Sequence, residues 1–314
     1  MNRLVSDPPD GELPSVTPEG QARGGSRSGP TRAMTAATSG QNHASRRHVG
    51  LLAIAVLCSA AAGLHAQWLN YRLPGVPRTP DGKVSLTAPT PRAPDGKPDL
   101  SGTWLDGGGY FGNLAKDLPP DQILMLPWAE ALVKENQTNL HKNDPMVGCL
   151  PPGVPRIDLG GSRGMPHPFK VVQTPALVVL LYETSTNQTF RQVFLDGRPL
   201  PSDPQPTWLG YSIGRWDGDA LVVDTVGFNG RAWIDTGSGH PQTETARVTE
   251  RFARRDFGHM DIEITVDDPK AYAKPWRARV PVDLLADSDL IETFCENEKD
   301  LGRMQRTPSS VTPR

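Results

Sequence analysis

The chain has 314 residues, of which 37% are hydrophobic and 22% charged, and its formal net charge at pH 7 is −2. These values exclude a disordered polyelectrolyte, a multi-span membrane protein and a nucleic-acid-binding protein that relies on a strong global positive field. Because the chain contains 31 Gly and 32 Pro, we expect frequent turns and short elements in place of long helices.

Residues 1–66 have the composition of an export leader. Arg46 and Arg47 precede an apolar run over residues 49–66, which ends in small residues. A basic region followed by an apolar run and small residues predicts a signal peptide, here cleaved after Ala66. The run is also close to the shortest length that spans a membrane, so an uncleaved anchor is the alternative. We therefore expect a periplasmic or secreted protein that meets the membrane only through this segment.

The cysteines agree with export. The chain has three, and Cys58 lies in the predicted leader. Cys149 and Cys295 remain, and an even pair in an oxidising compartment predicts a disulfide. Two unpaired buried thiols are the alternative.

Residues 67–100 are predicted to form a Pro-rich extended strap. The pattern Pro-Arg-x-Pro-Asp-Gly-Lys occurs in it twice, beginning at Pro77 and at Pro91. Pro-Asp-Gly is a turn sequence, so each unit predicts one turn. The strap is expected to be a linker that wraps the domain, and a tether to the cell envelope is the alternative.

A folded domain is expected over residues 101–300, followed by a disordered tail over residues 301–314. One helix is predicted from Pro127 to about Asn139, because Pro suits the first turn of a helix. A Pro- and Gly-rich loop follows over residues 140–168. Loops of this length are usually functional or pinned in place.

The rest of the domain has the pattern of a β meander. The candidate strands that follow the long loop are residues 169–174, 176–183, 189–195, 209–216, 220–228, 245–254, 259–267, 276–284 and 289–297. A further strand at Trp104 brings the total to about ten, joined mostly by compact turns. Closure into an antiparallel barrel removes the exposed sheet edges, so a barrel is predicted, with a β-sandwich as the alternative.

Alternation along residues 246–252 places a carboxylate inside this barrel, because Glu250 shares its face with the apolar side chains. A buried carboxylate is costly unless it is paired. One interpretation is a structural ion pair with Arg215 or Arg191. The other is an acid/base or ligand-anchoring role in an apolar cavity, where desolvation would raise the pKa of Glu250.

The loop over residues 227–244, at the expected barrel rim, carries several side chains that could act in catalysis or metal binding. Asp235, His240 and Glu244 would provide the further catalytic groups of an enzyme that uses Glu250, or three ligands of a metal. Their spacing matches no strong metal motif, so no metal is predicted, and an exposed turn histidine is the structural alternative for His240. The chain contains no phosphate-binding loop, nucleophile elbow or dinucleotide fingerprint, so no cofactor is predicted.

Aromatic side chains gather in sequence near the same rim. Aromatic side chains beside a polar loop suit sugar rings or flat apolar ligands, and they suit plugging of a barrel end equally well. The predicted ligand-binding residues are Trp208, Tyr211, Arg215, Asn229, Trp233 and Arg156.

Two resemblances bear on fold and location. Gly102-Thr103-Trp104 resembles the Gly-x-Trp start of lipocalin-like (calycin) barrels, which bind hydrophobic small molecules in the lumen. Four further segments resemble a large group of uncharacterised exported bacterial proteins: residues 94–102 (PDGKPDLSG), 149–153 (CLPPG), 214–219 (GRWDGD) and 295–298 (CENE). The resemblances imply a lipocalin-like barrel and export, and they imply no activity.

Three functions are therefore compared. The first is an exported barrel that binds a small apolar or amphipathic molecule, and the second is a barrel enzyme, a hydrolase, isomerase or lyase, that uses Glu250 and the rim cluster. The third is an envelope docking protein that acts through the strap. Pairing of Glu250 with an arginine would favour binding or a structural role, whereas an open pocket joining Glu250 to the rim cluster would favour catalysis. No nucleic-acid partner is expected.

Overall fold

The computed structural model describes residues 71–160, 167–183, 189–291 and 295. The predicted leader, its cleavage site and the predicted tail lie outside the described residues. Within the described part of the chain, no helix has the length and apolar character needed to cross a membrane.

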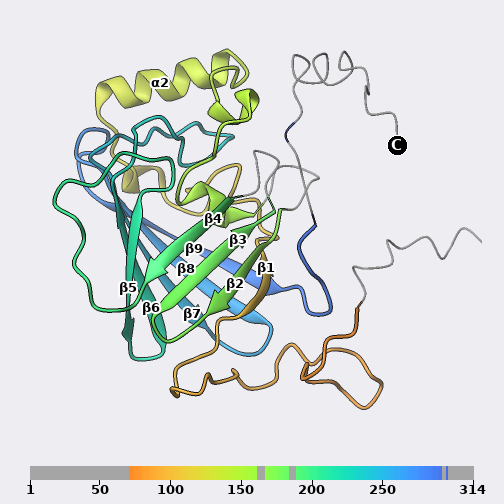
Figure 1. Ribbon diagram of the computed structural model, residues 1–314. Helices are drawn as coiled ribbons and strands as arrows, with labels where there is room; N and C mark the ends of the chain where they lie inside the picture. The colour runs from red at the N-terminus through yellow and green to blue at the C-terminus, as the bar shows by residue number, and fades with distance from the viewer. Residues whose placement is uncertain (1–70, 161–166, 184–188, 292–294, 296–314) are drawn as a thin grey trace, which may run out of the picture. The chain divides into compact units, whose positions relative to one another are not determined.

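The described residues form a closed barrel of nine strands (Figure 1). The strands are β1 (Gly102–Leu105), β2 (Phe169–Gln173), β3 (Leu177–Tyr182), β4 (Thr189–Phe194), β5 (Tyr211–Asp217), β6 (Ala220–Val226), β7 (Arg247–Arg254), β8 (His259–Asp267) and β9 (Trp276–Leu284). The prediction of a mainly β barrel is confirmed, and the sandwich alternative is wrong. Of the predicted last strand, residues 289–291 are not in a strand, and residues 292–294 and 296–297 lie outside the described part.

One contact in the barrel differs from the predicted antiparallel meander. β4 and β5 run parallel, with Val193 opposite Ser212 and Phe194 opposite Ile213, whereas the other neighbouring strands are antiparallel. A closed ring must contain an even number of direction reversals, so a ring with an odd number of strands needs at least one parallel contact. The long connection over residues 195–210 supplies the crossover that parallel neighbours require.

A helix lies across one end of the barrel (Figure 1). This helix, α2 (Pro127–Thr138), has Pro at its first turn as predicted. The chain before it pairs with the β8–β9 connection, where Met125 is opposite Tyr272. Three short 3₁₀ helices flank α2 in sequence: η3 (Pro120–Gln122), η4 (Pro145–Gly148) and η5 (Arg156–Leu159).

The long loop after α2 is pinned at two places. Cys149 forms the predicted disulfide with Cys295, with a Cα–Cα distance of 5.5 Å. Farther along, every residue of η5 is buried. The loop therefore turns inward at η5 and contributes side chains to the barrel core.

The strap, residues 71–100 (orange in Figure 1), contains two turns with the same hydrogen-bond pattern. Thr79 N donates to Lys83 O in the first unit, and Ala93 N donates to Lys97 O in the second, both at 2.9 Å. An arginine of each unit then reaches the barrel domain: Arg78 pairs with Asp287 and Arg92 with Asp219. The strap is thus a pair of anchored turns and not a uniformly extended segment.

Candidate functional site

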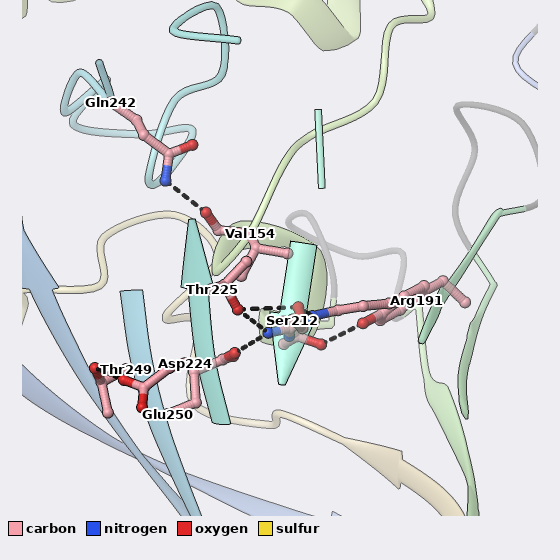
Figure 2. Close-up of polar contacts among 10 residues, drawn as sticks. Val154, Arg191, Ser212, Asp224, Thr225, Gln242, Thr249 and Glu250 are labelled. Atoms are coloured by element: carbon pink, nitrogen blue, oxygen red, sulfur yellow. Dashed lines mark hydrogen bonds and ion pairs between the residues drawn. The ribbon is translucent and has the colours of Figure 1, made fainter. Parts of the chain in front are cut away.

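Glu250 faces the barrel interior, as the alternation of β7 predicts, and its side chain is 0% exposed. Its partner is Arg191 of β4 (Figure 2). Arg215, the other candidate, has a side chain that is 62% exposed and pairs with Asp224 at 2.6 Å. The structural interpretation of Glu250 through Arg191 is therefore the one that the structure supports.

Arg191 is the centre of a buried ion cluster, which we define as Asp158, Tyr182, Arg191 and Glu250. Nη1 of Arg191 donates to Asp158 Oδ2 at 2.9 Å, and the Tyr182 hydroxyl donates to Asp158 Oδ1 at 2.6 Å. Because Asp158 lies on η5, the cluster joins the long loop to β3, β4 and β7.

Two hydroxyl groups complete the coordination of Arg191. Nε of Arg191 donates to Ser212 Oγ at 3.0 Å and Nη2 donates to Thr225 Oγ1 at 2.7 Å. These hydroxyl oxygens lie 3.0 Å apart and are hydrogen-bonded to each other (Figure 2). The guanidinium group therefore ties β4 to β5 and β6, next to the parallel contact, which has only two residue pairs.

The buried ion cluster contains two carboxyl groups and one guanidinium group. Burial raises the pKa of Asp158 well above its usual range, and the neighbouring charge of Glu250 adds to this effect. Burial opposes ionisation of Arg191, but the charges of Glu250 and Asp158 outweigh it and raise the pKa of the guanidinium group. Glu250 Oε1 has no hydrogen-bond partner among the described residues. The raised pKa favours the neutral form of Asp158, which would leave Arg191 and Glu250 as one balanced pair and lower the cost of burial.

Of the predicted rim cluster, the structure brings together two members. His240 Nδ1 and Asp235 Oδ2 lie 2.6 Å apart, and both side chains are buried, so the exposed-turn interpretation of His240 is wrong. Glu244 is exposed and pairs instead with Lys270. No hydrogen bond within the described residues joins His240 or Asp235 to Glu250, and no His, Cys, Asp and Glu side chains there form a group able to hold a metal.

The aromatic residues predicted to bind a ligand at the barrel rim, Trp208, Tyr211 and Trp233, make contacts within the chain. The Arg231 guanidinium lies 5.1 Å from the centre of a Trp208 ring, and Tyr211 stacks on Phe194 at 5.4 Å. Trp233 is 8% exposed. Only the buried position of Trp233 fits the plugging interpretation, because Tyr211 and Phe194 have the opposite parity to the buried Ser212 and Val193. A ligand-binding role for these aromatic residues stays a prediction.

The two other predicted ligand-binding residues also have partners. Asn229 Oδ1 accepts a hydrogen bond from Arg231 N at 3.0 Å. Arg156 is 1% exposed and donates to both carboxylate oxygens of Asp144, at 2.9 and 2.6 Å. Arg156 therefore fixes the long loop in the core of the protein.

A pocket of about 700 Å³ lies at the end of the barrel where β1 begins and β7 and β9 end. We call it the strap pocket, because its walls are the strap, the seam between β1 and β9, and residues 285–291. Its volume is typical of a small-molecule site. Apolar side chains supply much of its lining, among them Leu73, Val76, Phe257, Leu284, Leu290 and Ile291. None of the residues that the sequence predicted as catalytic or ligand-binding lines it, and neither do Arg191 and Asp158.

The walls of the strap pocket are held together by polar contacts. Arg78 pairs with Asp287 at 2.6 Å, and Lys170 of β2 pairs with Asp289 at 2.7 Å. At the seam, Gly102 has φ 140°, and a Cβ there would lie 2.5 Å from Leu284 Cδ1. Glycine is therefore needed where β1 approaches the side chain of β9.

Arg254 lines the strap pocket, although it is not among the site residues predicted from the sequence. It is 7% exposed, its guanidinium group lies 4.9 Å from a Trp104 ring centre and 5.2 Å from that of Phe257, and burial lowers its pKa to about 10. Its N–H groups donate to backbone carbonyl oxygens, two of which, those of Asp99 and Ser101, belong to the chain entering β1. The signal was present, because Arg254 has the same parity on β7 as Glu250.

A scan against protein-family models finds no match to this sequence, and a search of curated proteins finds no significant similarity. The resemblances to lipocalin-like barrels and to exported bacterial proteins stay expectations.

Proposed function

We propose that this protein is an exported small-molecule-binding barrel, and that its apolar or amphipathic ligand occupies the strap pocket. The observation that carries the proposal is the pocket itself: about 700 Å³, with apolar side chains from three segments and a buried guanidinium group in its wall. Ligand pockets typically combine such an apolar lining with a few fixed polar groups. The disulfide supports export, since disulfides persist in oxidising compartments.

The contents of the barrel argue against the lumen as the ligand site. The buried ion cluster occupies the interior between η5 and β7, and the inner faces of β8 and β9 are filled with buried apolar side chains. The carboxylate of Glu250 is ion-paired and has no exposed surface, so it is poorly placed to meet a substrate. These features favour binding over catalysis at Glu250.

Native mass spectrometry of the purified full chain tests the proposal. Ala286 lines the strap pocket, so Ala286→Phe should fill part of it. We expect the wild-type protein to carry a releasable organic molecule, or to bind the neutral fluorescent probe N-phenyl-1-naphthylamine saturably. The Ala286→Phe variant should carry no such molecule and bind the probe more weakly.

Ala273→Phe is the matched control, because Ala273 is exposed and does not line the pocket. It should behave like the wild type. An unchanged Ala286→Phe protein, or a wild-type protein that is empty and binds no probe, would overturn the proposal.

A further inference from the structure

The charged groups in and beside the wall of the strap pocket sum to zero. Asp287 and Asp289 at its rim are paired with Arg78 and Lys170. Arg254 forms no ion pair among the described residues, but the carboxyl group of Asp99 belongs to a residue that lines the same pocket. Three carboxyl groups (Asp99, Asp287 and Asp289) and three cations (Arg78, Lys170 and Arg254) therefore lie in or beside the wall. An ionised ligand group would have to leave water and would add a net charge to a wall whose own charges sum to zero, which is costly.

Unused hydrogen-bond donors are nevertheless present in the same wall. A guanidinium group has five N–H donors, and the contacts of Arg254 within the described residues use all but one, on Nη2. The hydroxyl groups of Ser101 and Thr103 make no hydrogen bond with any described residue, although both residues line the pocket. Thr103 is only 4% exposed. A ligand that displaced water from this wall and offered no hydrogen-bond acceptor would leave these donors unsatisfied.

From these two observations, and resting on the proposed function, we infer that the ligand is an uncharged, largely apolar molecule that carries a carbonyl oxygen. The carbonyl oxygen accepts a hydrogen bond from Arg254 Nη2 and lies beside the hydroxyl groups of Ser101 and Thr103. The apolar body of the ligand contacts Leu284, Leu290 and Ile291. A ketone or an ester of a lipid-like molecule has this chemistry.

Three competitors with the same number of carbon atoms test the inference: hexadecan-2-one, hexadecanoate and hexadecane. Each is titrated against the full chain loaded with N-phenyl-1-naphthylamine. We expect the ketone to displace the probe at a concentration about tenfold lower than either of the others, the scale of one hydrogen bond to a charged donor.

Two variants test whether the Thr103 hydroxyl group contributes to binding of the carbonyl group. Thr103→Val keeps the shape of the side chain and removes its hydroxyl group, so it should weaken the ketone about threefold and leave hexadecane unchanged. Thr265→Val is the matched control, because Thr265 lies on β8 and does not line the pocket. This pair leaves Arg254 in place, so the structural contacts of its guanidinium group are preserved.

The outcomes separate the two proposals. Tighter binding of hexadecanoate than of the ketone, or equal losses of ketone and hexadecane in Thr103→Val, would overturn the inference about the carbonyl group while leaving a binding protein. Failure of N-phenyl-1-naphthylamine and of all three chains to bind would overturn the proposed function as well.

Discussion

Asp158, Arg191 and Glu250 place three ionisable groups in the barrel interior, where their side chains are at most 2% exposed. Removing one partner of such a cluster destabilises a protein more than replacing the whole cluster with apolar side chains does, because the remaining charge stays buried. The cluster therefore specifies one arrangement of the loop and strands.

The raised pKa of Asp158 makes the free energy of unfolding depend on pH. Because the folded-state pKa is raised above the unfolded value, the contribution of Asp158 is fully present below the unfolded pKa and is lost as pH rises through the folded one. Between the two values, the free energy of unfolding should fall by about 1.4 kcal/mol per pH unit. Asp158→Asn should remove this slope, as measured by urea unfolding at a series of pH values upward from the ordinary aspartate pKa of about 4.

The control for this experiment is Asp217→Asn, since the Asp217 side chain is 72% exposed. Its slope should match that of the wild type. Identical slopes in Asp158→Asn and the wild type would show that Asp158 is not the group that holds the proton.

At the scale of elements, the two strap turns differ in what they hold. Arg78 and Asp287 have side chains that are 17% and 21% exposed, and their contact fixes one wall of the strap pocket. Arg92 and Asp219 are 48% and 67% exposed, and neither lines the pocket. The repeated sequence thus provides two similar anchors with different expected effects on ligand binding.

Arg78→Ala should weaken binding of N-phenyl-1-naphthylamine by about fivefold, because the segment that carries Asp287 loses its anchor, at a cost of about 1 kcal/mol. Arg92→Ala should leave binding unchanged, because an exposed ion pair contributes little. Fluorescence titration of the two variants measures both effects. Equal affinities in the two variants would show that the Arg78–Asp287 contact does not hold the pocket wall in place.

For the whole molecule, the disulfide joins parts of the chain that are 146 residues apart. Cys149 follows η4, and Cys295 follows the segment that forms a wall of the strap pocket. A crosslink of this kind restricts the unfolded chain, and removal of a native disulfide typically costs about 2–5 kcal/mol.

The double variant Cys149→Ser/Cys295→Ser should therefore lose about 2–5 kcal/mol of unfolding free energy in urea, relative to the wild type. Cys58→Ser, which changes the cysteine of the predicted leader, should retain the full stability. A double variant as stable as the wild type would show that the crosslink contributes nothing to the folded domain.

Local features of the sequence determined much of the fold. Period-two alternation in residues 246–252 placed Glu250 inside because neighbouring side chains on a strand point to opposite faces. The even pair of cysteines outside the predicted leader identified the disulfide, because it depends on residue type and number alone. The Pro-Asp-Gly units identified two turns, because a turn depends on residue type and short spacing.

Only the tertiary structure decided the closure and the candidate site. The parallel β4–β5 contact follows from closing an odd number of strands, which no single strand pattern encodes. The strap pocket is built from residues 71–103, the end of β7 and residues 285–291, and local periodicity does not report where such distant segments meet. Arg254 had the parity of an inward residue, but its role depends on carbonyl groups and aromatic rings that folding brings to it. The physical reason is that periodicity fixes the face of a side chain, whereas packing fixes its neighbours.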